Sequence, residues 1–325
     1  TGNNWATVNT FTEIQNSPSN RGRAFNLGGG KRNSPYYISR IEFINVQSKG
    51  NSINFGDFTN SRGDRSGLAN EIRGIAGGGN PSQNNIEYIM MASEGDAIDF
   101  GDLTESRLRG SAVSSSTRGI FIGGRNPNNT NVMDYIEIMT LGNALDFGDL
   151  LTSGTRGSGS VSSPTRAIIA NKEIDFITIA SKGNSVEFGL DIYSGQYHQG
   201  GGSTGTRAVW AGGYSSNTGS PYAAKVKTTS IRGVNIESGG LAVEYGNLIP
   251  NRGSTGAAYN YNSGTSDKTR AVWMGGYQID PNQYVNNIDF FTMNSTGNAQ
   301  DFGDLTEGIA LNTTCCDSHG GLGGI

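Results

Sequence analysis

The chain has 325 residues, of which 50 are glycine, 16% are charged and 34% are hydrophobic. Its 28 aspartates and glutamates outnumber 24 lysines and arginines, so the formal charge is −4 and the basic footprint of a nucleic-acid-binding protein is absent. No apolar stretch approaches the roughly 18 residues of a membrane helix, and glycine interrupts every candidate helical period. The composition therefore favours short strands joined by turns.

A short segment, Asp-Phe-Gly-Asp-Leu, begins at residues 99, 146 and 301, and looser copies begin at 54, 187 and 244. Its aromatic residue stands at positions 55, 100, 147, 188, 245 and 302, separated by 45, 47, 41, 57 and 57 residues. A period near 45 in a chain of short strands is typical of the blades of a β-propeller. We expect the aromatic ring to pack between blades and the glycine to allow backbones to approach closely.

Each unit contains the same elements in the same order. A first strand such as 111–116 precedes an arginine, a short apolar run such as 120–122 and a pair of glycines at 123–124. A variable loop leads to a third strand such as 86–91 and to a tight turn with glycine third, and the Asp-Phe-Gly-Asp-Leu strand comes fourth. Four antiparallel strands per unit predict an all-β propeller of four-stranded blades.

We assign the whole chain, 1–325, to one propeller domain. Its repeats span approximately 14–58, 66–103, 111–150, 160–191, 201–248 and 264–305, with 1–13 and 306–325 left for ring closure. We predict seven blades, six continuous and one composite. The composite blade takes its fourth strand from 5–11 and its first and second strands from 310–316 and 318–324, which would remove free sheet edges. Six blades is the alternative.

An arginine opens the second strand of every unit. The set is Arg23, Arg73, Arg118, Arg166, Arg207 and Arg270. The first acid of the fourth strand lies at the same end of a blade, so Arg118 or Arg270 is expected to pair with Asp146 or Asp301 in a structural ring. An anion site in the central channel is the alternative interpretation.

Length variation is confined to loops and links that share one face of the predicted disc, which we call the loop-rich face. Insertions gathered on one face of a repeat array usually mark a binding face. Tyrosines accompany these loops, beside several asparagines, and flat aromatic side chains suit sugar rings and protein partners alike. The candidate binding residues are Tyr36, Tyr37, Tyr214, Tyr222, Tyr277 and Tyr284. The alternative is that each ring only covers the loop beneath it.

Other motifs carry little weight. The Asp-Phe-Gly string lacks the other protein-kinase motifs, and the adhesion-like string Arg62-Gly63-Asp64 arises easily by chance in this composition. Neither His198 nor His319 stands in a metal-binding spacing, and no cofactor or metal is expected. The adjacent cysteines at 315 and 316 are interpreted as small buried residues, because a bond between strand neighbours would be strained.

Three motifs recur in a fixed order: Ser-Thr-Arg followed by a glycine pair, as at 115–124; a strand and turn, as at 174–184; and Asp-Phe-Gly-Asp-Leu-Thr. This order resembles the kelch-like repeats of virion proteins in tailed phages. The virion proteins of marine cyanobacterial phages are among those that these repeats resemble. The resemblance covers essentially the whole chain. It implies a tail fibre, receptor-binding or other structural protein outside the particle. The fourth unit lacks the glycine pair, and Arg232 replaces an acid in the fifth, so an equivalent site in every blade is not implied.

We therefore expect a non-enzymatic module on the virion exterior, part of an oligomeric assembly. Its partners would be other virion proteins and a host surface glycan or protein, with neither nucleic acid nor a membrane span involved. A secreted bacterial lectin-like propeller is the alternative. A propeller enzyme of the galactose-oxidase type is a weaker one, because it needs copper ligands from tyrosine and histidine and the chain has two histidines.

Overall fold

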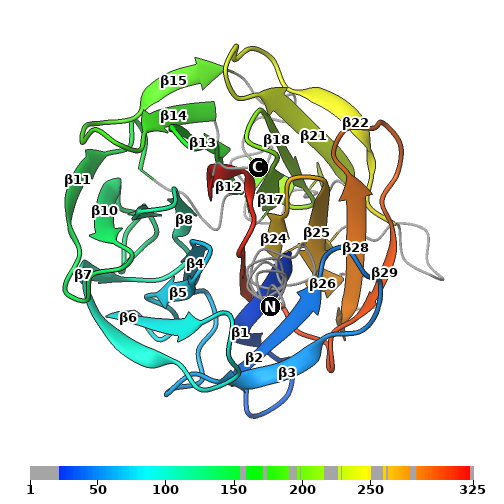
Figure 1. Ribbon diagram of the computed structural model, residues 1–325, viewed down its shortest axis with the longest axis horizontal. Coiled ribbons are helices and arrows are strands. Elements are labelled where there is room, and N and C mark those ends of the chain that lie inside the picture. The colour runs from blue at the N-terminus through cyan, green and yellow to red at the C-terminus, as the bar shows by residue number, and fades with distance from the viewer. Residues whose placement is uncertain are drawn as a thin grey trace, which may run out of the picture.

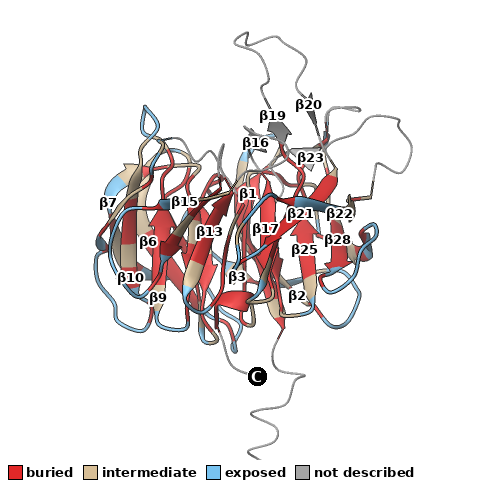
Figure 2. Cartoon of the chain, turned by 90° about the horizontal axis from the view of Figure 1, so that it is seen from above, coloured by how far each residue is buried: buried red, intermediate tan, exposed pale blue. Residues whose placement is uncertain are grey.

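The computed structural model describes residues 22–153, 159–170, 174–189, 196–197, 199–215, 226–227, 229–249, 259–260, 263–278 and 283–322. Its main elements are six antiparallel four-stranded sheets arranged as blades around a central axis (Figure 1). The strands run through the thickness of the disc, and exposed turns line its lower edge in the view of Figure 2. Within the described residues, no helix is long and apolar enough to cross a membrane.

The blades follow one another in chain order, and each is given from its innermost strand outward. Blade 1 contains β30 (Thr313–Cys316), β1 (Arg23–Gly30), β2 (Tyr37–Asn45) and β3 (Ile53–Asp57). Blade 2 contains β4 (Ser66–Ala69), β5 (Arg73–Gly77), β6 (Gln83–Met90) and β7 (Ile98–Arg107). Blade 3 contains β8 (Ser111–Ser114), β9 (Arg118–Ile122), β10 (Val132–Glu137) and β11 (Leu145–Asp149).

The second half of the ring has the same plan. Blade 4 contains β12 (Ser160–Ser162), β13 (Arg166–Ala170), β14 (Ile174–Thr178) and β15 (Val186–Gly189). Blade 5 contains β17 (Gly200–Ser203), β18 (Arg207–Ala211), β21 (Ser230–Asn235) and β22 (Val243–Asn247). Blade 6 contains β24 (Ser263–Ser266), β25 (Arg270–Met274), β28 (Asn287–Thr292) and β29 (Gln300–Asp304).

Two small three-stranded sheets extend the last two blades on the loop-rich face. Each joins a strand from an interblade link to a hairpin between the blade's second and third strands. One contains β16 (Gln196–Tyr197), β19 (Tyr214–Ser215) and β20 (Val226–Lys227). The other contains β23 (Tyr259–Asn260), β26 (Tyr277–Gln278) and β27 (Gln283–Tyr284). Short strands from the chain's longest insertions thus pair with each other.

The Asp-Phe-Gly segment holds neighbouring blades together at the circumference. The Phe100 ring is buried, and its carbonyl accepts a hydrogen bond from the N–H of Gly142 in the next blade's turn at 2.9 Å. A Cβ at Gly101 would lie 2.5 Å from the carbonyl carbon of Gly142, so only glycine fits. The same overlap between strand and turn glycines recurs at all six junctions, which confirms the role expected for this glycine.

The repeated arginines also join blades. Each guanidinium stacks on an aromatic ring of its own blade, 4.5 to 5.4 Å from the ring centroid. Each also donates a hydrogen bond to a backbone carbonyl that follows the third strand of the next blade. In ring order, the acceptors of Arg23, Arg73, Arg118, Arg166, Arg207 and Arg270 are Met91, Ile138, Ile179, Ile236, Met293 and Val46. The contacts of this arginine ring therefore differ from the predicted pairing with Asp146 or Asp301, because the side chain reaches across to the neighbouring turn.

Buried acids on the third strands form a further set of junctions. Asp134 is fully buried and accepts hydrogen bonds from Thr104 Oγ1 at 2.6 Å and Thr104 N at 3.2 Å, and it also pairs with Arg107. Glu87 and Glu42 accept from Thr59 and Thr306, the threonines that follow the same segment in other blades. In blade 5, where the acid is replaced, Arg232 donates to Gln199 Oε1 at 2.5 Å.

Ring closure corrects the prediction of a seventh blade. β30 pairs with β1 as the innermost strand of blade 1, over the register Phe25↔Cys315. On the outside, blade 6 bonds directly to blade 1, because Asp304 N donates to Asn51 Oδ1 at 3.0 Å. No room remains between them for the composite blade, so the described residues form six. The C-terminal segment does complete a sheet begun near the N-terminus, while the predicted strand at 5–11 lies outside the described residues.

The segment 318–324 was predicted as a second strand. Its described part is instead a single turn of 3-10 helix, η2 (Gly320–Leu322). Gly320 and Gly321 are packed so tightly against the inner strands of blades 3, 4 and 5 that a Cβ on either would overlap neighbouring atoms. With blade 1 already complete, this glycine-rich segment enters the central channel.

Candidate binding surface

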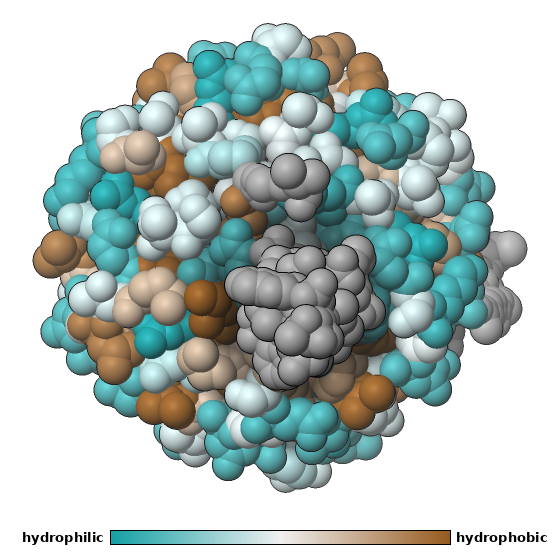
Figure 3. All heavy atoms as spheres, viewed as in Figure 1, coloured by the Kyte–Doolittle hydropathy of each residue, from teal (hydrophilic) through white to brown (hydrophobic). Residues whose placement is uncertain are grey.

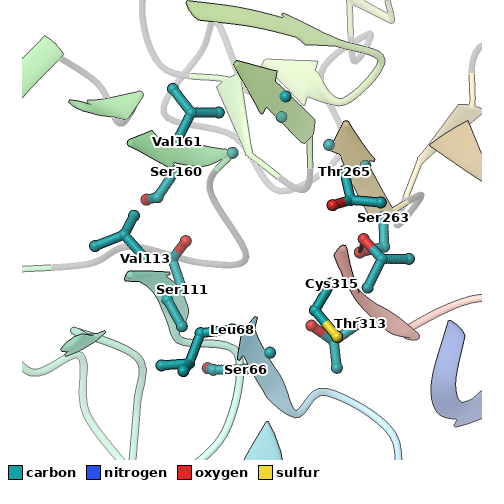
Figure 4. A pocket seen from close by; sticks show the side chains of 18 of the residues that line it. Ser66, Leu68, Ser111, Val113, Ser160, Val161, Ser263, Thr265, Thr313 and Cys315 are labelled. Atoms are coloured by element: carbon teal, nitrogen blue, oxygen red, sulfur yellow. Dashed lines mark hydrogen bonds between the residues drawn. The ribbon is translucent and has the colours of Figure 1, made fainter. Parts of the chain in front are cut away.

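The central channel contains a cavity of about 130 Å³, lined by the innermost strand of every blade. Hydroxyl side chains contribute much of its wall, and Ser111 lies across the channel from Ser263 and Thr265 (Figure 4). Apolar side chains such as Leu68 and Val113 supply the remainder. The wall is therefore mixed, with many hydrogen-bonding groups and small apolar areas.

The floor of this cavity is closed at the end opposite the loop-rich face. Four serines at the ends of inner strands each donate to the carbonyl of the preceding blade at 2.6 to 2.9 Å, and they are Ser114, Ser162, Ser203 and Ser266. Ala69 and Cys316 occupy the equivalent positions in the other two blades. The four serines thus form a belt that is interrupted at Ala69 and Cys316. At this interruption, His319 Nε2 forms a hydrogen bond with the Ala69 carbonyl at 2.8 Å.

His319 is buried, and burial lowers its pKa to about 4, so the ring is neutral near pH 7. Its Nδ1 accepts a hydrogen bond from Gly321 N at 3.1 Å, which makes Nε2 the protonated nitrogen and the donor to Ala69. Both nitrogens are thus used in closing the channel floor, and neither is left to bind copper. His198 lies outside the described residues.

The two cysteines of β30 are buried free thiols. Burial raises the pKa of both, so they stay protonated near neutral pH. Among the residues that the structure describes, no group of three His, Cys, Asp or Glu side chains is placed to hold a metal ion.

The loop-rich end of the channel carries a polar network. Asp64 Oδ2 accepts a hydrogen bond from Arg109 Nε at 3.1 Å, and Asn80 donates to the hydroxyl of Tyr37 at 2.7 Å and also bonds Asp64. Burial raises the pKa of Asp64 despite the opposing effect of Arg109. Burial and the nearby Asp64 also raise the pKa of Tyr37.

This geometry also explains the string at 62–64. Asp64 is 6% exposed and is held by Arg109, and Arg62 is 9% exposed with its guanidinium bonded to Asn85. Asp64 lines the channel and Arg62 is held against blade 2, so the string is not presented as an extended adhesion loop.

Three of the six candidate tyrosines come together on this face. Tyr277 and Tyr284 pack edge to face with centroids 5.6 Å apart. Burial raises the pKa of Tyr284, and the proximity of Tyr277 and Tyr37 adds to the effect. Tyr36, next to this cluster in sequence, is 65% exposed. The side chain of Tyr214, on β19, and the whole of Tyr222 lie outside what the structure describes.

An exposed aliphatic residue recurs two positions before the aromatic residue of the fourth strand. It is 51 to 58% exposed in five blades, as Ile53, Ile98, Leu145, Val186 and Val243, whereas blade 6 has Gln300. Figure 3 shows the face opposite the loop-rich face, where apolar residues are spread around the rim and do not form one patch. Single exposed apolar residues of this kind are ordinary in soluble proteins.

Sequence reasoning missed Asp64, Arg109, Asn80 and the hydroxyl lining of the channel as parts of a site. Asp64 was noticed only within a chance string, and the inner strands carry no recurring motif beyond a terminal serine. The comparisons with known proteins add no further assignment, because no protein-family model and no curated protein sequence matches the chain.

Proposed function

We propose that this chain is a non-enzymatic attachment or structural module on the exterior of a tailed-phage particle. The observation that carries the proposal is that the recurring residues and the variable insertions have separate structural roles. The recurring arginines, buried acids and Asp-Phe-Gly glycines join blades to each other. The insertions, by contrast, gather on one face, where they form two additional small sheets.

Such a scaffold suits attachment because the closed ring is rigid while its loops can vary without disturbing it. Blade 6 and blade 1 are bonded at the inner strands, through Ser263 and Thr314, and at the outer strands, through Asn51 and Asp304, so this junction of the ring is closed. The resemblance of the repeats to kelch-like repeats of phage virion proteins supports the location on the particle. Other virion proteins would hold the module, and a host surface glycan or protein would bind the loop-rich face.

The tyrosines of this face are the contact residues that we propose. Tyr277 and Tyr284 present two rings at nearly a right angle, and Tyr37 lies near them beside a buried carboxylate. Aromatic rings with polar tips bind sugars and proteins at a low entropic cost. The same observation favours the second candidate, a secreted bacterial lectin-like propeller, which differs in location and not in the binding chemistry.

Labelling of intact virions tests the location. An antibody raised against the purified chain should decorate discrete positions on particles of the phage that encodes it, as seen by electron microscopy. Particles from which the gene has been deleted provide the control. Absence of label on intact and disrupted particles, with the protein found in the culture medium of a bacterium, would favour the lectin-like alternative.

A further inference from the structure

Three described residues other than glycine adopt a left-handed backbone, and all three lie at the loop-rich end of the central channel. Leu311, Asp64 and Arg109 have φ of 57°, 57° and 58°. This conformation costs a non-glycine residue about 1–2 kcal/mol, and such strain gathers at binding and catalytic sites. Its restriction to one place among the residues that the structure describes points to a local requirement.

The three residues are structural equivalents. Each stands two positions before the innermost strand of its blade, in blades 1, 2 and 3 respectively. Their backbones are linked in series, since Asp64 N donates to the Leu311 carbonyl at 2.7 Å and Arg109 N donates to the Asp64 carbonyl at 2.9 Å. This linked row forms one side of the channel mouth and places an apolar, an acidic and a basic side chain next to one another.

All three residues line the cavity. His319 lines the cavity at the end opposite the loop-rich face, where η2 is packed against the inner strands. An enclosed water needs roughly 10–15 Å³ of such space, so a cavity of about 130 Å³ holds about ten waters or one sugar ring with its hydroxyl groups. The wall includes Ser160, whose buried Oγ has no hydrogen-bond partner.

The charges at the mouth restrict the ligand. Asp64 is a buried carboxylate that bonds Arg109 and Asn80 and lies near Arg125, and burial outweighs these neighbours in setting its pKa. An added hydroxyl donor would stabilise the charged form, whereas an anion would be repelled. Among the described residues that line the pocket, no cluster of carboxylates is placed to favour a divalent cation.

We propose that this pocket binds a single uncharged sugar residue, with sugar hydroxyls donating to the Asp64 carboxylate at the mouth and to Ser160 Oγ deeper in the channel. Leu311 provides an apolar contact for the C–H face of the ring. The inference deepens the proposed attachment function and rests on it for its biological meaning, since the sugar would be the exposed end of a host surface glycan.

The test is a titration of the purified full chain with a panel of neutral monosaccharides comprising hexoses, 6-deoxyhexoses and N-acetylhexosamines, followed by calorimetry and by saturation-transfer NMR. A uronic acid and CaCl₂ complete the panel. At least one neutral sugar should bind saturably, and the uronic acid of the same ring configuration should bind at least tenfold more weakly.

Two variants locate the site. Asp64→Asn keeps the size of the side chain, and asparagine tolerates a left-handed backbone, so the fold should persist while affinity falls at least tenfold, as expected for loss of a charge-assisted hydrogen bond. Ser160→Ala removes an oxygen without a protein partner, so it should weaken binding about fivefold without lowering the melting temperature. Asp146→Asn, an exposed acid on the outer strand β11, is the matched control and should bind like the wild type.

Absence of saturable binding by every neutral sugar would overturn the proposal. So would equal affinities of the wild type and both pocket variants, or stabilisation by CaCl₂ in place of sugar. Attachment of the wild type to host cells is measured separately. Cell attachment without sugar binding would refute this pocket alone, whereas sugar binding without cell attachment or virion labelling would refute the attachment function.

Discussion

Alanine at Gly101 should separate blade 2 from blade 3 at the circumference. The new Cβ would overlap the carbonyl group of Gly142 and lie 3.0 Å from Asn143 N. Both neighbours are backbone atoms, so no side-chain rotation relieves the overlap. The strand and the turn must move apart, and the interblade hydrogen bonds between them lengthen or break.

The magnitude follows from the bonds at that junction. Gly142 N donates to the Phe100 carbonyl at 2.9 Å, Ala144 N to the Asp102 carbonyl at 2.7 Å, and Asp102 N to Asn143 Oδ1 at 3.0 Å. At about 1 kcal/mol each, their loss costs about 3 kcal/mol. The positive φ of Gly101, 146°, adds about 1 kcal/mol of backbone strain on substitution.

Gly142→Ala is the matched control. Its φ is 144°, nearly that of Gly101, but a Cβ there would meet no atom within 4 Å. It should cost only the strain of about 1 kcal/mol. Urea denaturation followed by tryptophan fluorescence compares the midpoints of the two variants. Equal destabilisation would refute the argument that close approach of the two backbones, and not backbone strain, requires glycine in this motif.

Three other substitutions address the arginine ring, the loop-rich face and the channel floor. Arg118→Ala should destabilise the fold by about 1–2 kcal/mol, because it removes hydrogen bonds to the Ile179 and Ala180 carbonyls and the stacking on Tyr135. An unchanged denaturation midpoint would contradict a structural role for this arginine. Tyr277→Ala with Tyr284→Ala should weaken attachment to host cells at least tenfold in a cell-binding assay with little change in melting temperature, whereas Ser93→Ala and Ser295→Ala, in turns on the opposite face, should bind normally. Burial lowers the pKa of His319 to about 4, whereas an unfolded histidine titrates near 6.5, so its contribution to stability is complete above about pH 6.5 and is lost as the pH falls toward 4. Stability measured from pH 7 to pH 4 should therefore fall by up to about 3 kcal/mol more in the wild type than in His319→Gln, and equal slopes would refute a buried neutral imidazole.

Much of each blade could be predicted because its strands carry strong local signals. The apolar run at 120–122 lies at the end of β9, and the third strand expected at 288–293 is β28, Asn287–Thr292. The pairs of glycine and the turn glycines mark ends that few other residues can form. The partner of each arginine could not be predicted, because it is a backbone carbonyl in another blade and leaves no trace in the side-chain pattern.

The innermost strand has the weakest sequence signal, and sequence reasoning misplaced it in blade 1. It is only three or four residues long in every blade, and its composition ranges from Thr-Thr-Cys-Cys in β30 to Gly-Gly-Gly-Ser in β17. With so weak a pattern, a first strand before residue 23 and one after residue 312 were equally compatible with the repeat. The difference decides whether the C-terminal segment begins a new blade or completes the first.

The pocket that we propose for a sugar could not be predicted for a related reason. In a repeat protein the side chains that recur are those used at every junction, as the threonine-to-acid bonds at Asp134 and Glu87 illustrate. A binding site that occurs once in the ring is expected where equivalent positions of the blades have different residues. At the position two residues before the inner strand, blades 1, 2 and 3 have Leu311, Asp64 and Arg109, three unlike side chains on one strained backbone. Only the three-dimensional ring places these departures side by side, because they are separated by 45 residues or more along the chain.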